Sequence, residues 1–248
     1  TVSATSTTTL TISNLNSVAD GHYTLTVTGT ESGGSVTHSE TVYLIVQGTP
    51  ETTPGNSMSF DNSDYVSVTQ IGQEYKFGDD RSFSVECWIK TTTTSGDDAI
   101  ISNEDWDSSY NPGWTMSIES GRIGFNIADG SNRTRLRTST TYNDGEWHHI
   151  VGTVDRNANL SRIYIDGDLV LETGIGHIGN INNNLIIGIG AAAENDWKYL
   201  GEIEEARVWR KALTTTEVRE NMHRPIDVCD ADLISCWQFN EASGDVLD

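Results

Sequence analysis

The stretch Asp144-Gly-Glu-Trp-His-His-Ile-Val-Gly-Thr-Val-Asp155 is the most informative part of this sequence. It opens with turn-forming residues and continues into a β-strand that begins at Trp147. Neighbouring residues of a strand point to opposite faces, so His148 and His149 cannot bind one metal ion together. We therefore predict that both histidines are structural, with each imidazole bonded to the backbone or to a nearby carboxylate.

Two further blocks follow in order. Ile163-Tyr-Ile-Asp-Gly-Asp-Leu-Val170 contains two short strands that meet at Asp166-Gly167, a dipeptide that favours the tight turn of a β-hairpin. The other block is Gly201-Glu-Ile-Glu-Glu-Ala-Arg-Val-Trp-Arg-Lys-Ala-Leu213. In this order the three blocks resemble the LamG-like jelly-roll family of the concanavalin A-like lectin/glucanase fold. The family pattern is roughly DGxWHHVAxTxD, then LYVDGxLV, then GxIDEVRIWxRALS.

The resemblance extends on both sides of these blocks. Met58-Ser-Phe-Asp-Asn-Ser-Asp-Tyr-Val66 is similar to the family's opening FDGxxDYV, and Leu233-Ile-Ser-Cys-Trp-Gln-Phe-Asn-Glu-Ala-Ser-Gly244 is similar to its LVAYWxFNEGSG. Many short alternating segments, separated by Gly, Asn and Asp, also indicate an antiparallel sandwich. We predict an all-β protein in which residues 57–248 form a concanavalin A-like antiparallel β-sandwich, or jelly roll, with a short helix near Thr216–Met222.

The first 48 residues differ in composition, because they contain no Lys or Arg and are rich in Thr and Ser. Gly21-His-Tyr-Thr-Leu25 resembles the G-x-Y-x-C element of Ig-type domains, with Leu at the cysteine position. We predict that residues 1–48 are the C-terminal part of an Ig-like β-sandwich whose other half precedes Thr1, and that residues 49–56 form a linker. The chain is then a piece of a longer protein.

Charge and cysteine content exclude several classes of protein. The net charge is −21, which argues against nucleic acid and anionic membranes as partners. The sequence has no apolar run of membrane-spanning length, so we expect no membrane insertion. Three cysteines do not make a disulfide framework, although Cys229 and Cys236 are close enough in sequence to pair, and Cys87 reads as a small buried residue.

Glycoside hydrolases of this fold need two carboxylates that converge on one bond. Glu202-Ile-Glu-Glu205 superficially resembles their E-x-D-x-x-E signature. The third acidic position is absent, because the next residue on the face of Glu202 and Glu204 is Ala206. We therefore predict no catalytic residues.

A calcium ion takes six to eight oxygen ligands, which acidic turns supply well. One short turn near the start of the jelly roll and one late strand carry such groups, and the family resemblance implies a structural calcium in this region. The predicted ligands are Asp61, Asn62, Asp64, Glu204 and Glu205. The alternative is an ion pair between Glu205 and Arg207. A second acidic segment is predicted to be a solvated loop rather than another ion site, and it holds Asp97, Asp98, Glu104, Asp105 and Asp107.

Sugar binding requires aromatic side chains beside planar polar groups. Two polar, turn-rich loops meet this requirement, and the predicted ligand-binding residues are Trp106, Tyr110, Asn195, Asp196 and Trp197. The alternative is that these aromatic residues anchor their own loops. Five other tryptophans lie in strand patterns and are predicted to pack in the core or on a sheet face: Trp88, Trp114, Trp147, Trp209 and Trp237.

Arg133, Arg135 and Arg137 alternate on one face of a short strand. We predict that they neutralise acidic neighbours across the sheet, and the alternative is that they hold a sulfated or uronic polysaccharide.

Together these patterns favour a non-catalytic carbohydrate-binding or adhesion module of a larger secreted or cell-surface protein, associated with calcium. Its expected partners are a polysaccharide or glycoconjugate and other domains of the parent chain. The second hypothesis is a structural or protein-interaction module, and the third is a glucanase-type hydrolase.

Overall fold

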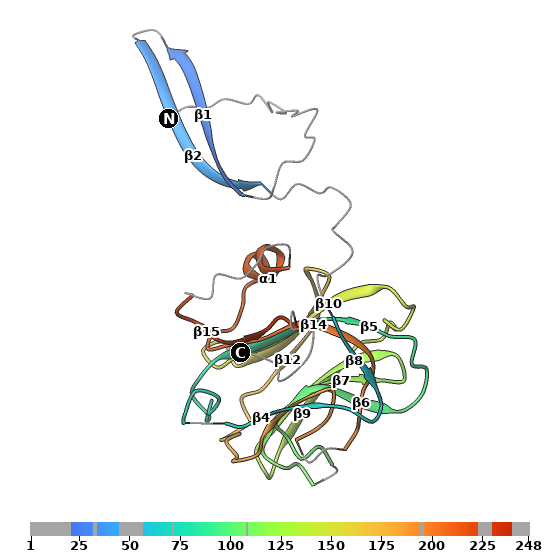
Figure 1. Cartoon of the computed structure of the whole chain (residues 1–248). Helices are drawn as coiled ribbons and strands as arrows, with labels where there is room; N and C mark the ends of the chain where they lie inside the picture. The colour runs from blue at the N-terminus through green and yellow to red at the C-terminus, as the bar shows by residue number, and fades with distance from the viewer. Residues whose placement is uncertain are drawn as a thin grey trace. The chain divides into compact units, whose positions relative to one another are not determined.

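The computed structural model describes residues 21–31, 34–44, 57–70, 72–107, 109–193, 196–222 and 230–239, the first two ranges by their backbone alone. The chain divides into two compact units, Thr1–Thr49 and Pro50–Asp248. In the first unit β1 (Gly21–Glu31) and β2 (Gly34–Leu44) form an antiparallel hairpin (Figure 1). Such a hairpin occurs in many folds, so the partial Ig-like sandwich stays a prediction.

The second unit is a sandwich of two antiparallel sheets, which lie as two layers in Figure 1. One sheet has six strands in the order β4-β13-β6-β7-β8-β9. Its strands are β4 (Val66–Val68), β6 (Asp97–Ser102), β7 (Gly113–Glu119), β8 (Arg122–Ala128), β9 (Arg133–Arg137) and β13 (Ile187–Ile189). This arrangement confirms the predicted jelly-roll sandwich.

The other sheet has seven strands in the order β12-β11-β10-β5-β14-β15, and β3 pairs with β14. Its strands are β3 (Met58–Asp61), β5 (Phe83–Lys90), β10 (Trp147–Asp155), β11 (Leu160–Ile165), β12 (Asp168–Gly174), β14 (Leu200–Trp209) and β15 (Leu233–Trp237). The early strand β3 and the late strand β14 are therefore neighbours.

Alternate residues of the strands fill the space between the sheets with apolar side chains. From β5, β7 and β8 these are Phe83, Val85, Cys87, Ile89, Trp114, Met116, Ile118, Ile123, Phe125 and Ile127. Gly152 of β10 faces the same core, and a Cβ at this position would lie 2.7 Å from the ring of Phe125. The missing side chain thus allows the two sheets to approach closely at this point.

The stretch around the two histidines folds as its pattern predicts. Strand β10 begins at Trp147, and β11 joins β12 through Asp166 and Gly167, which both have positive φ angles, 51° and 83°. His148 Nδ1 lies 2.8 Å from Asp166 Oδ2, and this carboxylate raises the pKa of the histidine. His149 is on the opposite face, buried beside Trp88. The predicted separation of the histidines is confirmed.

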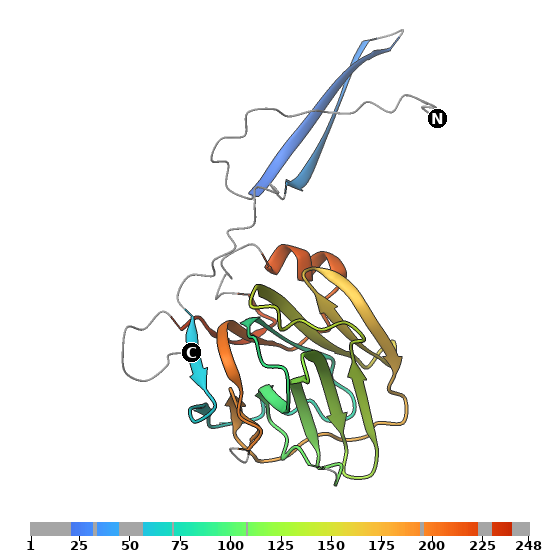
Figure 2. The same cartoon turned by 90° about the vertical axis from the view of Figure 1, so that its right-hand side faces the viewer.

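A short helix, α1 (Thr215–Asn221), covers part of the outer face of the seven-stranded sheet (Figure 2). Thr214 and Glu217 form a capping box, in which each side chain bonds to the other residue's backbone N–H. Val218 packs against Val151 and Trp209. Among the described residues no helix has the length and apolar character needed to span a membrane.

A buried ion pair lies on the same outer face. Glu86 and Arg207 are fully buried, and Arg207 Nη1 donates to Glu86 Oε1 over 3.1 Å. Trp209 Nε1 donates to the same oxygen over 3.0 Å, and His149 Nε2 lies 3.4 Å from Glu86 Oε2. Burial alone would raise the pKa of Glu86, but His149 and Arg207 hold it at about 2, so this carboxylate is charged in the folded protein.

Candidate functional site

Two loops that are distant in sequence bring two indole rings together. Trp106 lies between β6 and β7, and Trp197 lies between β13 and β14; their ring centroids are 5.6 Å apart with an interplanar angle of 58°. Trp106 is 6% exposed and packs against Ala99 and Ala192, whereas Trp197 is 45% exposed. Trp106 therefore anchors its loop, and Trp197 presents its ring to solvent.

Tyr110 supplies a second exposed ring, with 43% of the residue accessible. Its φ angle is 60° and that of Trp197 is 55°, in a left-handed region that bulky residues rarely adopt. Backbone bonds hold both residues there, from Gly130 N to Tyr110 O (2.8 Å) and from Ala99 N to Trp197 O (2.7 Å). Such conformations persist only when the surroundings impose them, and they gather at ligand-binding sites.

The loop of Trp106 packs on the outer face of the six-stranded sheet, which is polar. Here Glu104 is fully buried; its Oε2 accepts hydrogen bonds from Asn126 Nδ2 (2.6 Å) and Thr115 Oγ1 (3.1 Å). Arg133 Nη2 lies 3.8 Å from Glu104 Oε1. The prediction of a solvated acidic loop is wrong for Glu104, because bonds to β7 and β8 draw this side chain against the sheet.

Burial raises the pKa of Glu104 to about 7, against the lowering effects of Asn126, Thr115 and Arg133. Three buried atoms of this cluster have no hydrogen-bond partner within the described ranges, namely Glu104 Oε1, Asn126 Oδ1 and Arg133 Nε. Buried polar atoms are nearly always paired in folded proteins. The cluster thus has two acceptors and one donor with unused bonding capacity beside the aromatic loops.

The arginines of β9 lie along the edge of this face. Arg135 Nε donates to Glu119 Oε1 over 3.0 Å, and its Nη2 donates to the other oxygen of the same carboxylate. Arg137 Nε is 3.1 Å from Glu119 Oε2, and Glu119 is fully buried. The predicted neutralisation of acidic neighbours across the sheet is confirmed. Arg133 instead lies over the Tyr110 ring, 4.8 Å from its centroid.

Of the predicted sugar-binding residues, Trp106 and Trp197 lie in contact, while Tyr110 lies beside Arg133. Asp196 is exposed next to Trp197, and its charge helps to raise the pKa of Asp105, after burial and Asp107. Asn195 lies outside the described residues. Sequence reasoning missed the polar floor of the site, Glu104 with Asn126, although the alternation of β7 and β8 indicates which residues face away from the core.

The predicted calcium ligands are not gathered in the same way. Asp61 pairs with Leu200 in the β3–β14 ladder, so Glu204 lies further along β14. Asp61 Oδ1 accepts from the Ser63 backbone over 2.9 Å. A bulge in β14 follows Glu204 and turns the Glu205 carboxylate onto Arg207, the ion pair that was the alternative.

The remaining candidates, Asn62 and Asp64, sit in the turn after β3. In the described part of the chain no three His, Cys, Asp or Glu side chains form a group able to hold a metal. Calcium association therefore stays a prediction.

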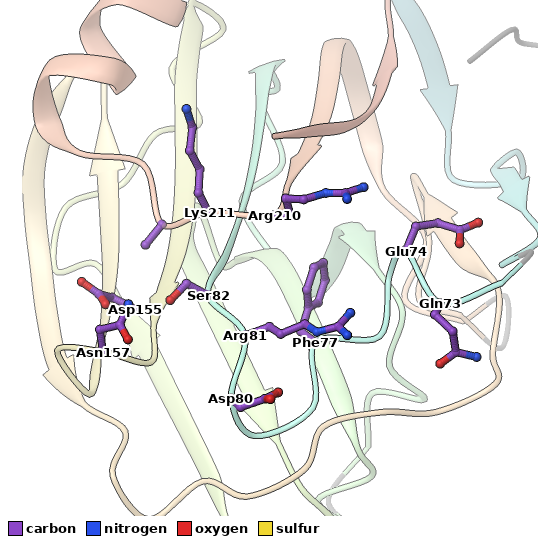
Figure 3. Close-up of a pocket in the computed structure, with 11 residues that line it drawn as sticks. Gln73, Glu74, Phe77, Asp80, Arg81, Ser82, Asp155, Asn157, Arg210 and Lys211 are labelled. Atoms are coloured by element: carbon purple, nitrogen blue, oxygen red, sulfur yellow. The ribbon is translucent and has the colours of Figure 1, made fainter. Parts of the chain in front are cut away.

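A separate cavity of about 880 Å³ lies beside the seven-stranded sheet (Figure 3). Phe77, Arg81 and Arg210 line it, and Figure 3 shows the two guanidinium groups on either side of the phenyl ring. Glu74 and Asp80 also line it, so its walls carry both signs of charge. The sequence does not predict this cavity, because its residues come from three segments that only the folded chain assembles.

Two antiparallel sheets closed over one apolar core, with exposed aromatic loops above a polar sheet face, define a lectin-like jelly-roll domain. The chain belongs to the concanavalin A-like lectin/glucanases superfamily, through a laminin G family match over residues 60–219.

Known proteins similar to this chain include a curated relative and several solved structures. Non-toxic nonhemagglutinin type A of Clostridium botulinum (strain Kyoto / Type A2) is 27% identical over 173 residues, which is 67% of this chain and 14% of that protein. The chain thus matches only a small part of this relative.

Among solved structures, a putative carbohydrate binding protein from Bacteroides ovatus superposes with a TM-score of 0.62 at 16% identity, over 89% of this chain and 61% of that one. The CBM40 domain of the Ruminococcus gnavus IT-sialidase superposes with a TM-score of 0.57 at 11% identity, over 68% and 98% respectively. At these identities the likeness concerns the fold.

Proposed function

We propose that this chain is a non-catalytic carbohydrate-binding module of a larger secreted or cell-surface protein. The observation that carries the proposal is the pair of exposed rings, Tyr110 and Trp197, held by left-handed backbone on loops beside the polar face of the six-stranded sheet. Stacking the apolar face of a sugar on an indole or phenol removes both surfaces from water. Rigid rings make this stacking inexpensive in conformational entropy.

The neighbouring polar groups suit the hydroxyl groups of a sugar. Asp196 is exposed beside Trp197, and Asp107 is exposed on the loop of Trp106. Hydroxyl groups can both donate and accept hydrogen bonds, so they can satisfy acceptors and donors of this kind. Ligand sites of small molecules commonly combine an apolar surface with a few placed polar groups.

The described relatives point in the same direction. One structural neighbour is named a putative carbohydrate binding protein, and the CBM40 domain of the Ruminococcus gnavus sialidase has also been solved bound to α2,3-sialyllactose. Glycan binding by domains of this fold makes glycan binding by this chain a natural first test.

The carboxylates of the chain favour binding over hydrolysis. Glu104 and Glu119 are fully buried, and two arginines hold Glu119. Glu202 is bonded to Ser57 and lies 3.6 Å from Lys90 Nζ, and Glu204 is buried. A glycosidase needs two carboxylates that reach the scissile bond from either side, whereas three of these four are buried and the fourth, Glu202, is bonded to Ser57.

A glycan array tests the proposal with the whole chain and three variants. We expect wild type to bind a defined set of glycans, and Trp197→Ala and Tyr110→Ala to lose most of that signal. Leu169→Ala is the matched control, because Leu169 is also exposed (46%) but lies on β12 of the other sheet. Binding that survives both aromatic substitutions, or no binding to any glycan, would contradict the proposal. In the second case a protein partner becomes the leading alternative.

A further inference from the structure

Positive charge is scarce in this chain, and one short strand carries three of its basic residues. Only 15 of 248 residues are Lys or Arg, yet Arg133, Arg135 and Arg137 occupy alternate positions of the five-residue strand β9. Their alternation places all three on the face opposite Leu136, which is in the core. The side chains of Arg135 and Arg137 are each 39% exposed. Guanidinium groups are thus presented to solvent on the face that carries the aromatic loops.

Of the three carboxylates beside this row, those of Glu104, Glu119 and Asp97, only that of Glu119 lies within hydrogen-bonding distance of an arginine. Arg135 and Arg137 share one buried carboxylate, that of Glu119. Among the described residues a second acid near them is Asp97, whose Oδ2 is 3.8 Å from Arg135 Nη2 and whose side chain is 42% exposed. An exposed ion pair at that distance contributes little and exchanges readily with a ligand.

Arg133 is paired with a carboxylate even more weakly. Its nearest carboxylate is Glu104 at 3.8 Å, beyond hydrogen-bonding distance, and its Nε has no partner among the described residues. Its Nη2 donates to the carbonyl oxygen of Asp107, and its guanidinium carbon lies over the exposed Tyr110 ring. A guanidinium over an exposed ring is suited to an anionic group that also contacts the ring.

We propose that the β9 arginine row, with Tyr110, is a subsite for the anionic group, carboxylate or sulfate, of an acidic sugar. The inference rests on the proposed carbohydrate-binding function and names the class of glycan. An acidic sugar that approaches a chain of net charge −21 meets general repulsion, so it requires a local positive surface of this kind. Arginine forks bind carboxylate and sulfate oxygens through paired, charge-assisted hydrogen bonds.

The subsite has a built-in dependence on pH. Burial raises the pKa of Glu104 to about 7, so this side chain is mainly neutral in slightly acidic medium and mainly charged in alkaline medium. The charged groups that face Glu104 are Arg133 from β9 and Asp107 from its own loop, while β7 and β8 present neutral Thr115 and Asn126. Protonation of Glu104 removes the charge of the carboxylate that lies 3.8 Å from Arg133, so acidic sugars bind more tightly at pH 6 than at pH 8.

Isothermal titration calorimetry with matched neutral and acidic probes tests the proposal. The probes are lactose, sialyllactose, a galacturonate trisaccharide and a sulfated lactose, each titrated into the whole chain. We expect at least one acidic probe to bind about tenfold more tightly than lactose, since one charge-assisted hydrogen bond corresponds to roughly this factor. Preference for the carboxylate probes or for the sulfate probe identifies the group. Equal binding of lactose and all acidic probes would overturn the proposal.

Variants separate the subsite from the fold. Arg137→Gln is expected to lower acidic-probe affinity about tenfold and leave lactose affinity unchanged, while Arg137→Lys retains part of the preference. Arg162→Gln is the control, because Arg162 is likewise an ion-paired arginine of a strand, bound to Asp155 and Glu172, but it lies on β11 of the other sheet. Should Arg137→Gln unfold, the salt dependence of wild-type binding decides: affinity for acidic probes that does not fall with added salt refutes the subsite.

The outcomes distinguish the two proposals. Lactose binding without any acidic preference defeats the arginine subsite but leaves the carbohydrate-binding function standing. Absence of binding to every probe and to a glycan array defeats both.

Discussion

Replacing Glu104 by Gln should stabilise this protein in alkaline medium. Glu104 is a buried carboxylate whose folded-state pKa is about 7, compared with an ordinary value of 4.5. A group whose pKa is raised by folding contributes stability that is complete below pH 4.5 and is lost as the pH rises through 7. At pH 8 the folded protein therefore contains a buried charge that the unfolded chain would solvate.

The magnitude follows from the pKa difference. About 2.5 pKa units at about 1.4 kcal/mol each correspond to roughly 3 kcal/mol of unfolding free energy. Glutamine has the same shape, and its carbonyl oxygen can still accept from Asn126 and Thr115, so it keeps the bonds and removes the charge. For a domain of this size the gain corresponds to a Tm increase of about 6–12 °C at pH 8.

Urea unfolding at pH 5 and pH 8 measures the effect. We expect the Glu104→Gln variant to exceed wild type by roughly 3 kcal/mol at pH 8 and by much less at pH 5. Glu146→Gln is the control, because Glu146 is exposed. The reasoning would be refuted if the variant's unfolding free energy exceeded that of wild type by the same amount at both pH values, or if the variant were less stable than wild type at pH 8.

Three further predictions concern the scaffold and the metal. Glu86→Gln should cost about 3–5 kcal/mol at pH 7 by removing the fully buried counter-ion of Arg207 and leaving it with the partly exposed Glu205. Since the pKa of Glu86 is held at about 2, the difference should shrink as the pH falls from 4.5 to 2 in acid-unfolding curves. Gly152→Ala should lower stability by about 1–3 kcal/mol in urea, because the new methyl group meets the ring of Phe125, and a neutral result would mean that the sheets separate easily. If calcium binds the folded state, the Tm measured with calcium must exceed the Tm measured with EDTA. Identical melting curves would show that the folded domain binds no calcium.

Local sequence signals account for the scaffold. The Asp166-Gly167 turn depends on the backbone freedom of two adjacent residues, and the alternation of Trp147 to Asp155 depends on the geometry of a single strand. The turn and the alternation each depend on a few consecutive residues, so the hairpin and the separation of the histidines were predictable. The short helix was predictable for the same reason, because Thr214 and Glu217 form the capping box at its start.

The site was predictable only in part, because it depends on contacts between distant segments. The composition of the two loops indicated Trp106 and Trp197 as candidate binding residues. The contact between the two rings, however, requires β13 to pair with β6, and no local sequence pattern predicts this pairing. The sequence around Glu104 is typical of a solvated acidic loop, and the contacts that bury this side chain come from Asn126 and Thr115 on other strands. The bulge that turns Glu205 onto Arg207 is likewise a property of the folded sheet.

The two indoles of Trp106 and Trp197 also make the site an optical reporter of its own occupancy. Aromatic chromophores 5.6 Å apart at 58° couple strongly enough to give the pair its own near-ultraviolet circular dichroism. Arg135 lies 5.9 Å from the Trp106 ring, so a change in charge on the arginine row reaches this chromophore directly. A molecule that settles on the exposed ring of Trp197 should alter both the fluorescence and the dichroic bands without any label. Screening for ligands of this domain can therefore begin with a spectrometer and the unmodified chain.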